Sequence, residues 1–254
     1  MKKVHPLDVR CLVLELITSS GSSHIGSCYS TVEILTTLYN DVLTQDDVFL
    51  LSKGHAAAAL YSVLALAGQL SIEDLKKSYG SNSSIYMTHA SHFVPGVAFS
   101  SGSLGMLSNV ACGIGKAKQF TQCSGRIFVL LSDGELNEGS NWEAFMYAAH
   151  HKLNNVNFII DLNGLQSLTS TRDTLDMSDL SRKFEAFGLS ALHVNGHDCK
   201  DLTAAMTTQT PEPKVIIAKT VKGKGAALIE NKVAWHYKSP SSSEYKVILE
   251  QLNA

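Results

Sequence analysis

The sequence predicts an α/β protein with a doubly wound, mostly parallel sheet that carries helices on both faces. Three short runs support this class, because they are β-branched and apolar on both faces, as a helix-covered parallel sheet requires. They are Arg126–Leu131, Asn157–Ile160 and Lys214–Ala218. Between them, apolar residues recur at intervals of three and four, which is typical of helices that bury one face. The alternation of the two patterns favours one domain.

Two further segments complete the expected sheet, and helical patterns fill the intervals between the strands. Val48–Leu51 is a fourth strand candidate and Ala191–Val194 a weaker fifth. The helical patterns consist of Leu104, Leu107, Ala111 and Ile114, and of Trp142, Phe145, Ala149 and Leu153. An N-terminal helix is expected to bury Leu12, Leu14, Leu16 and Ile17. The serine-rich stretches 81–84 and 239–243 are typical of surface loops, and the second leads into a short terminal helix.

Composition excludes several classes of protein. With 254 residues, 44% hydrophobic and 17% charged, the chain can bury a sizeable core, which argues against a disordered or fibrous protein. A net charge of −2 argues against nucleic-acid binding through a basic face. Five cysteines without a CxxC pair indicate reduced thiols in a cytoplasmic protein. Arg10 and Glu15 interrupt the apolar start, and no run reaches the about 18 apolar residues of a membrane span.

Polar residues that suit a metal ion follow two neighbouring strands. Asp133-Gly134 comes after one strand, and Asn163 and Leu165 come after the next. In a right-handed β-α-β crossover both strands end at the same sheet edge, so Asp133 and Asn163 should face each other across the ligand-binding crevice. One carboxylate and one amide oxygen, with the Leu165 carbonyl as a third ligand, suit Mg²⁺. This ion takes its remaining oxygens from phosphates and water.

Gly134 extends this prediction to a phosphate group. A glycine lets the backbone approach a phosphate closely, and the helix N-terminus behind it offers free N–H groups. The chain lacks the GxGxxG, GxxxxGK[ST], GxSxG and HExxH motifs, so the common α/β sites are not indicated. Asp-Gly and Asn-Gly turns are common singly. Their pairing at matching strand ends predicts a diphosphate that Mg²⁺ bridges to the protein.

These residues resemble the thiamine diphosphate motif, which is usually written GDG followed by a terminal Asn, with Ser132 here in place of the first Gly. Further stretches resemble one branch of that superfamily, the transketolases. In order, they are Ser23–Gly26 with Val32–Leu35, Leu51–His55, Thr88–His92 with Val94–Val97 and Gly102–Gly105, Asn195–Asp198, and Lys219–Gly225 with Ala234–His236. The similarity spans roughly residues 10–240. It implies the thiamine diphosphate-binding fold and a ketol-transferring transferase.

The resemblance also implies roles for individual residues. Three histidines would be catalytic, since imidazole binds polyols and handles protons near neutral pH. These are His24, His89 and His236. The residues implied in cofactor binding are His55, Gly102, Ser103, Leu104, Asp133, Gly134, Glu135, Asn163 and His236. The implied metal ligands are Asp133, Asn163 and Leu165.

Some positions depart from the family pattern or leave a choice open. The loop before Pro95 is one residue shorter than usual, so His89 is favoured for the third histidine site with His92 as the alternative. Ala98 replaces a glutamate, and Met106-Leu107 replaces a polar–Gly pair near the expected cofactor. We expect Glu138 to be an interface residue rather than a catalytic one. The pair His197-Asp198 is expected to cap the following helix.

In transketolases the glutamate that activates the cofactor lies in a second, pyrimidine-binding domain. The resemblance implies that residues 1–254 are one diphosphate-binding domain and that the pyrimidine-binding domain is absent from this chain. It therefore implies a two-plus-two assembly with a separate C-terminal subunit, and a sugar or sugar-phosphate substrate. The alternatives are a non-catalytic thiamine diphosphate-binding module, the α subunit of a 2-oxo acid dehydrogenase, or a fragment of a deoxyxylulose-phosphate synthase. The sugars themselves are left open.

Overall fold

The sheet has the predicted parallel architecture. The computed structural model describes residues 2–253, and within them five parallel strands pair in the order β1-β2-β3-β5-β4. The strands are β1 (Val48–Leu51), β2 (Ile127–Ser132), β3 (Val156–Leu162), β4 (Ser190–Asn195) and β5 (Lys214–Lys219). All of the expected strands are therefore confirmed, the weaker one included.

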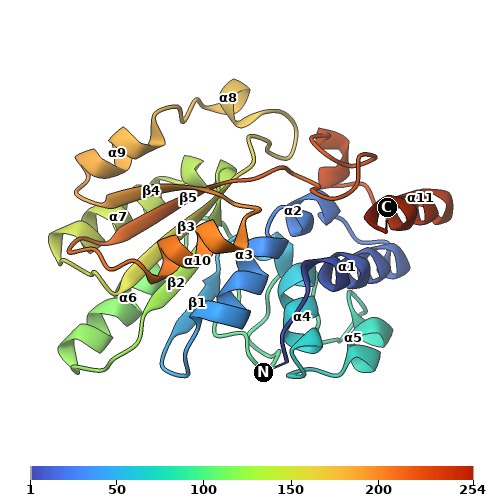
Figure 1. The fold of residues 1–254 in the computed structure, drawn as a ribbon, viewed down its shortest axis with the longest axis horizontal. Coiled ribbons are helices and arrows are strands. Elements are labelled where there is room, and N and C mark those ends of the chain that lie inside the picture. Colours follow the sequence, from blue (N-terminus) through green and yellow to red (C-terminus); the bar gives the residue numbers. More distant parts are fainter. Residues whose placement is uncertain (1, 254) are drawn as a thin grey trace.

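Helices cover both faces of this sheet (Figure 1). The first half of the chain contains α1 (Pro6–Ser20), α2 (Ile25–Tyr29), α3 (Val32–Thr37), the π-helix Leu38–Val42, the 3-10 helix Gly54–Ala56, α4 (Ala57–Leu66), α5 (Ile72–Ser78) and α6 (Leu107–Phe120). The second half contains the 3-10 helix Gly134–Asn137, α7 (Gly139–His150), α8 (Thr171–Thr174), α9 (Leu180–Ala186), α10 (Cys199–Thr207), the 3-10 helix Val233–His236 and α11 (Ser242–Leu252). Among the described residues, no helix is both long and apolar enough to cross a bilayer.

Alternate strand residues pack into two separate cores. Phe128 and Leu130 of β2 join the core under α1, α3, α4 and α10, whereas Val129 and Leu131 join the core under α6, α7 and α9. This division follows from the period of two along a strand. Both sets are fully buried, which explains the continuous apolar runs in the sequence.

The helix predictions located the elements but not all of their ends. Leu104 lies before the start of α6, and Leu153 lies beyond the end of α7. The terminal helix α11 begins at a capping box formed by Ser241 and Glu244, and it packs beside α1 from the other end of the sequence (Figure 1).

The connections set the position of the site. The β2–β3 and β3–β4 connections place α7 and α9 over one face, whereas the β4–β5 connection places α10 over the other. The chain thus passes from β3 to the edge strand β4 and then returns to β5, which lies between them. Ligands in α/β sheets bind at the carboxyl ends of the strands, beside such a reversal of strand order. Ser132 pairs with Asp161 in register, so β2 and β3 end side by side.

Candidate functional site

A cavity of about 230 Å³ opens at the carboxyl ends of the strands. Its lining residues come from the ends of β2 and β3, from the loops after β1 and β5, from the N-terminal part of α2, from the long loop between α5 and α6, and from the end of the 3-10 helix Val233–His236. They are His24, Ser27, Lys53, His55, His89, Gly102, Leu104, Ser132, Gly134, Asn163, Leu165, Gln166, Ser167, Lys222, His236 and Tyr237. We call this cavity the histidine pocket.

Four imidazole rings converge in the histidine pocket from four segments of the chain. The ring centroid of His24 lies 5.3 Å from that of His55, 5.6 Å from that of His89 and 5.0 Å from that of His236. His24 has a left-handed backbone with φ of 76°, and its N–H donates to the carbonyl of His236 at 2.9 Å. Such strain in a non-glycine residue is found mainly where a site needs a fixed geometry.

The environment of the pocket keeps these imidazoles neutral. Burial, followed by the charges of His89, Lys222 and Lys53, lowers the pKa of His24 to about 4. Burial and the same ammonium groups lower the pKa of His55 well below its usual value and that of His236 to about 3, and burial alone lowers the pKa of His89. A neutral imidazole both donates and accepts a hydrogen bond, which suits recognition of sugar hydroxyls.

Lys222 was not singled out in the sequence, although it belongs to the basic segment that follows β5. Its Nζ donates to Nδ1 of His236 at 2.9 Å and to the carbonyl oxygens of Leu165 and Gln166 at 3.2 Å each. Because Nδ1 of His236 accepts, the hydrogen of the neutral ring lies on Nε2. Burial and the neighbouring Lys53 lower the pKa of Lys222 to about 8.

The expected metal ligands lie together at the ends of β2 and β3. Asp133 is 2% exposed, and its oxygens accept from the N–H groups of Gly134 at 2.8 Å and Gly164 at 2.5 Å. The second bond joins the two strand ends, as the crossover argument predicted. Burial and the charge of Asp161 raise the pKa of Asp133 to about 6. Asn163 and Leu165 line the histidine pocket beside it.

The chemistry of this donor set fits a magnesium–diphosphate group. Among the described residues, no cluster of three or more His, Cys, Asp or Glu side chains could hold a metal ion by itself. A carboxylate, an amide oxygen and a carbonyl oxygen instead suit Mg²⁺ that draws further ligands from phosphate. Gly134 meets the side chain of Gln166, whose Cγ would lie 2.9 Å from an added Cβ. A phosphate at Gly134 therefore requires this flexible side chain to move.

A buried ion pair lies beside the histidine pocket, and the sequence did not predict it. Lys53 and Asp161 have fully buried side chains and form a short ion pair. Asp161 also accepts from Ser30 Oγ at 2.6 Å, from Asn163 Nδ2 at 3.3 Å and from the hydroxyl of Thr220. The charge of Lys53 and these hydrogen bonds lower the pKa of Asp161 in spite of its burial.

The structure distinguishes between the two candidates for the third histidine site. His89 lines the histidine pocket. His92 is exposed, its Nδ1 lies 2.7 Å from Ser100 Oγ, and its ring packs on Phe93 at a centroid distance of 4.1 Å. His89 is thus the residue that can act in the pocket.

Other candidates lie beside the pocket rather than in it. Ser103 is exposed next to the lining residues Gly102 and Leu104. Glu135 is fully buried, and its carboxylate accepts from the N–H of Gly105 at 2.9 Å and from the hydroxyl of Ser52. Glu135 therefore fixes the backbone of the segment 102–105 through the hydrogen bond from Gly105. Two of the departures from the family pattern, Ala98 and Met106, are exposed.

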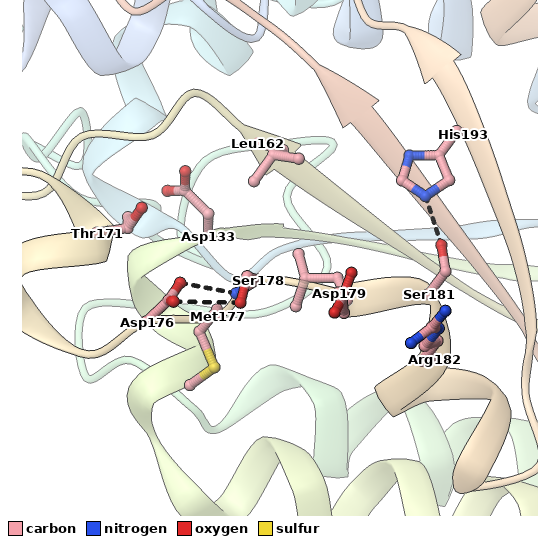
Figure 2. Close-up of a pocket in the computed structure, with 11 residues that line it drawn as sticks. Asp133, Leu162, Thr171, Asp176, Met177, Ser178, Asp179, Ser181, Arg182 and His193 are labelled. Atoms are coloured by element: carbon pink, nitrogen blue, oxygen red, sulfur yellow. Dashed lines mark hydrogen bonds between the residues drawn. The ribbon is translucent and has the colours of Figure 1, made fainter.

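A second cavity of about 480 Å³ lies on the other side of Asp133, between β4 and the segment around α8 and α9 (Figure 2). Its polar groups are bonded to one another. Asp176 accepts from the N–H of Ser178 at 2.9 Å and from its hydroxyl at 3.1 Å, and Ser181 bonds to Nε2 of His193. Although it is larger, this cavity lacks the convergent imidazoles and ammonium groups, so the chemistry belongs to the histidine pocket.

Comparisons with known proteins identify the family of this chain. A family model described as transketolase, thiamine diphosphate binding domain, matches residues 3–252. The chain is 37% identical to an apulose-4-phosphate transketolase subunit of Actinobacillus succinogenes, over 99% of this chain and 95% of the relative. It is 30% identical to the 6-deoxy-6-sulfo-D-fructose transketolase subunit SqwG of Clostridium sp. (strain MSTE9), over 96% of this chain and 93% of the relative.

Longer relatives are matched over part of their length. The chain is 36% identical to human transketolase, over 96% of this chain but 41% of the relative. The crystal structure of transketolase from Campylobacter jejuni superposes with a TM-score of 0.89 at 29% identity, over 99% of this chain and 43% of that one. The chain therefore spans nearly the whole of the subunit relatives and about two fifths of the human and Campylobacter enzymes.

Proposed function

This chain belongs to the transketolase family, and we propose that it acts as the diphosphate-binding subunit of a two-chain transketolase. The reaction is the transfer of a two-carbon ketol unit from a ketose donor to an aldose acceptor. The observation that carries the proposal is the histidine pocket, where neutral imidazoles and buried ammonium groups meet at the ends of β2 and β3. We propose that residues 1–254 form one such domain.

The diphosphate end of the cofactor has candidate partners in the histidine pocket and beside it. When bound, thiamine diphosphate supplies the electron sink that allows a C–C bond beside a carbonyl to break. Asp133, Asn163 and the Leu165 carbonyl would hold Mg²⁺ against the diphosphate, because all three offer hard oxygen ligands. Lys53 and Lys222 line the same pocket, and their positive charges favour an anionic group there.

The remaining side chains are suited to the sugar. His24, His89 and His236 present neutral rings that can exchange hydrogen bonds with neighbouring hydroxyls. His236 faces substrate as an Nε2–H donor, since Lys222 occupies its Nδ1. The ring of His24 lies between those of His89 and His236, so one hydroxyl-bearing carbon can meet more than one imidazole.

The second polypeptide is proposed from the relatives. Two proteins that match this chain over 90% or more of their own length are each named as one subunit of an apulose-4-phosphate transketolase. We propose a partner that carries the pyrimidine-binding domain and its activating glutamate, in a two-plus-two assembly located in the cytoplasm. The relatives are named for apulose 4-phosphate and for 6-deoxy-6-sulfo-D-fructose, both of which carry an acidic group. A ketose with an acidic group is accordingly the proposed donor class.

Reconstitution tests the proposal. The chain is purified alone and with a chain that carries the pyrimidine domain, and ketol transfer is measured with thiamine diphosphate, Mg²⁺ and a panel of phosphorylated and sulfonated ketoses. Turnover is expected only with both chains. Strong activity of this chain alone contradicts the proposal that it is one half of a two-chain enzyme. Cofactor binding by the pair without any turnover supports the alternative of a non-catalytic module, and oxidation of a 2-oxo acid supports the dehydrogenase alternative.

A matched pair of variants tests the choice of histidine in the same assay. His89→Ala should reduce turnover, because its ring lies in the pocket beside that of His24. His92→Ala should leave turnover unchanged, because its ring lies outside the pocket against Phe93. Equal losses in the two variants would contradict the assignment of His89.

A further inference from the structure

A buried cluster of ionisable side chains lies outside the histidine pocket. Arg10 of α1 and Glu33 of α3 form two short contacts, with Nη1 to Oε1 at 2.7 Å and Nη2 to Oε2 at 2.9 Å. His197, in the turn between β4 and α10, lies with Nδ1 2.9 Å from Oε2 of Glu33. The side chains of Arg10 and Glu33 are only 7% and 10% exposed. Burial of three such groups is costly unless they are fully paired, so their remaining bonds indicate what they do.

Those remaining bonds go to the backbone on either side of Lys222. Nε2 of His197 accepts from the N–H of Val221 at 2.8 Å, and Nε of Arg10 donates to the carbonyl of Lys224 at 2.8 Å. Because Nε2 of His197 accepts, its hydrogen lies on Nδ1 and is donated to Glu33. One carboxylate therefore orients both groups that hold the segment 221–225.

The segment 221–225 needs such support. It follows the end of β5 at Lys219 and has no regular secondary structure, and its glycines at 223 and 225 have φ of +81° and +104°. Yet Lys222 is 2% exposed, and its Nζ makes three contacts inside the histidine pocket. The N–H of Gly223 also donates to the carbonyl of Gly26 at 2.9 Å, and the carbonyl of Lys222 accepts from the N–H of Asn231 at 2.9 Å, so the loop keeps other anchors without the cluster.

We propose that Arg10, Glu33 and His197 form a positioning cluster, which sets the backbone of segment 221–225 so that Lys222 reaches the histidine pocket. The inference rests on the proposed function in one respect, namely that Lys222 helps to bind an anionic group in the pocket. The three residues lie on α1, α3 and the β4–α10 turn, and none of them lines the histidine pocket. The expectation that His197 belongs to a helix cap is therefore replaced: Asp198 alone caps α10, by accepting from Lys200 and Asp201.

Two substitutions of His197 separate positioning from packing. His197→Gln places an amide oxygen near the position of Nε2 and can still accept from Val221, whereas His197→Phe keeps the ring volume and loses the acceptor. Binding of inorganic pyrophosphate with Mg²⁺ is measured by calorimetry on the full chain. We expect His197→Phe to bind about tenfold more weakly and His197→Gln within about threefold of wild type. Equal binding of wild type and His197→Phe, or weaker binding of His197→Gln than of His197→Phe, would overturn the proposal.

Glu33→Gln provides a second perturbation with a matched control. It should weaken pyrophosphate binding about tenfold, because Gln has one acceptor oxygen where the carboxylate has two, so an NH₂ group would face a donor of Arg10 or His197. Glu15→Gln removes a carboxylate from the exposed Lys76–Glu15 pair, whose side chains are 40% and 42% exposed, and should leave binding unchanged. A folded Glu33→Gln chain with wild-type binding contradicts the proposal; should this variant fail to fold, the His197 pair decides.

A readout that needs no ligand distinguishes failure of this inference from failure of the proposed function. In the unliganded chain, the side-chain ¹⁵N NMR signals of His236 report whether Nδ1 still accepts from Lys222. His197→Phe should shift these signals and His197→Gln should leave them near wild type. If the wild-type chain does not bind pyrophosphate, the proposed diphosphate site is wrong. The His236 signals then test the positioning cluster by themselves. Unchanged signals in His197→Phe would refute positioning.

Discussion

Substitution of Asp161 by Asn should destabilise this protein far more than an ordinary surface change. The side chains of Lys53 and Asp161 are both 0% exposed, so the Asn variant leaves the Lys53 ammonium buried without a counter-charge. Breaking a buried pair in this way costs about 3–5 kcal/mol. The amide also presents hydrogens toward the donors Ser30 and Thr220, whose hydroxyls now bond to the carboxylate.

This free energy converts into a measurable shift of the melting temperature. An unfolding entropy of about 2.1 cal/mol/K per residue gives about 0.5 kcal/mol/K for 254 residues. A loss of about 3–5 kcal/mol therefore lowers the melting temperature by roughly 6–9 °C. Differential scanning calorimetry measures the shift. The matched control is Asp41→Asn, which breaks the exposed Lys3–Asp41 pair at 3.4 Å and should shift the melting temperature by less than about 2 °C.

A double variant tests the physical reason for the loss. Lys53→Met combined with Asp161→Asn removes both charges, so the double variant should be more stable than Asp161→Asn alone, with a coupling energy above about 2 kcal/mol. A fall of less than about 2 °C for Asp161→Asn would refute the reasoning. So would a double variant whose losses simply add, since the two residues would then not interact as a charge pair.

Three further predictions concern the histidine pocket. Asp133→Ala should abolish Mg²⁺-dependent binding of thiamine diphosphate, because it removes the one carboxylate among the expected ligands; calorimetry with and without Mg²⁺ checks this, and retained Mg²⁺ dependence contradicts it. His236→Ala should lower ketol transfer by the reconstituted enzyme at least about 100-fold but cofactor affinity less than about tenfold, and the reverse order would assign His236 to the cofactor. The pKa values of His24 and His236 are lowered from 6.5 to about 4 and about 3, so the unfolded chain takes up protons first as the pH falls. The free energy of unfolding should therefore decrease from about pH 6.5 towards pH 4, and His24→Gln should flatten this slope in urea titrations.

The strands and the pairing of their ends were predictable because those signals are local. A strand that is covered on both faces must be apolar at every position, and the runs at β2, β3 and β5 satisfy this condition. The ends of parallel neighbours meet at one edge, so Asp133 and Asn163 could be placed together from their positions after β2 and β3. Helix ends were less predictable: Leu153 packs in the core as expected, but α7 ends before it because Lys152 has φ of +50° and the N–H of Leu153 turns back to the carbonyl of Ala148 at 3.0 Å.

The order of the motifs also predicted the family, and the family model and the relatives confirmed it. For the histidine that reaches the pocket, the resemblance favoured His89 but left His92 open. His89 and His92 lie three residues apart in a loop without regular secondary structure, and only the folded path of that loop turns one inward and the other outward. No periodic pattern constrains such a segment, so the direction of each side chain could not be predicted from the sequence.

What the sequence determined by itself was the α/β class, the transketolase family and the placement of a candidate site, with Asp133 and Asn163, at two neighbouring strand ends. The tertiary structure alone decided the contacts that surround that site. Lys53 meets Asp161 across 108 positions of the chain, and Glu33 meets His197 across 164. Each residue is polar and unremarkable in its own segment. Its partner is set by how the helices pack on the two faces of the sheet, so the charge pairs that support the pocket exist only once the chain has folded.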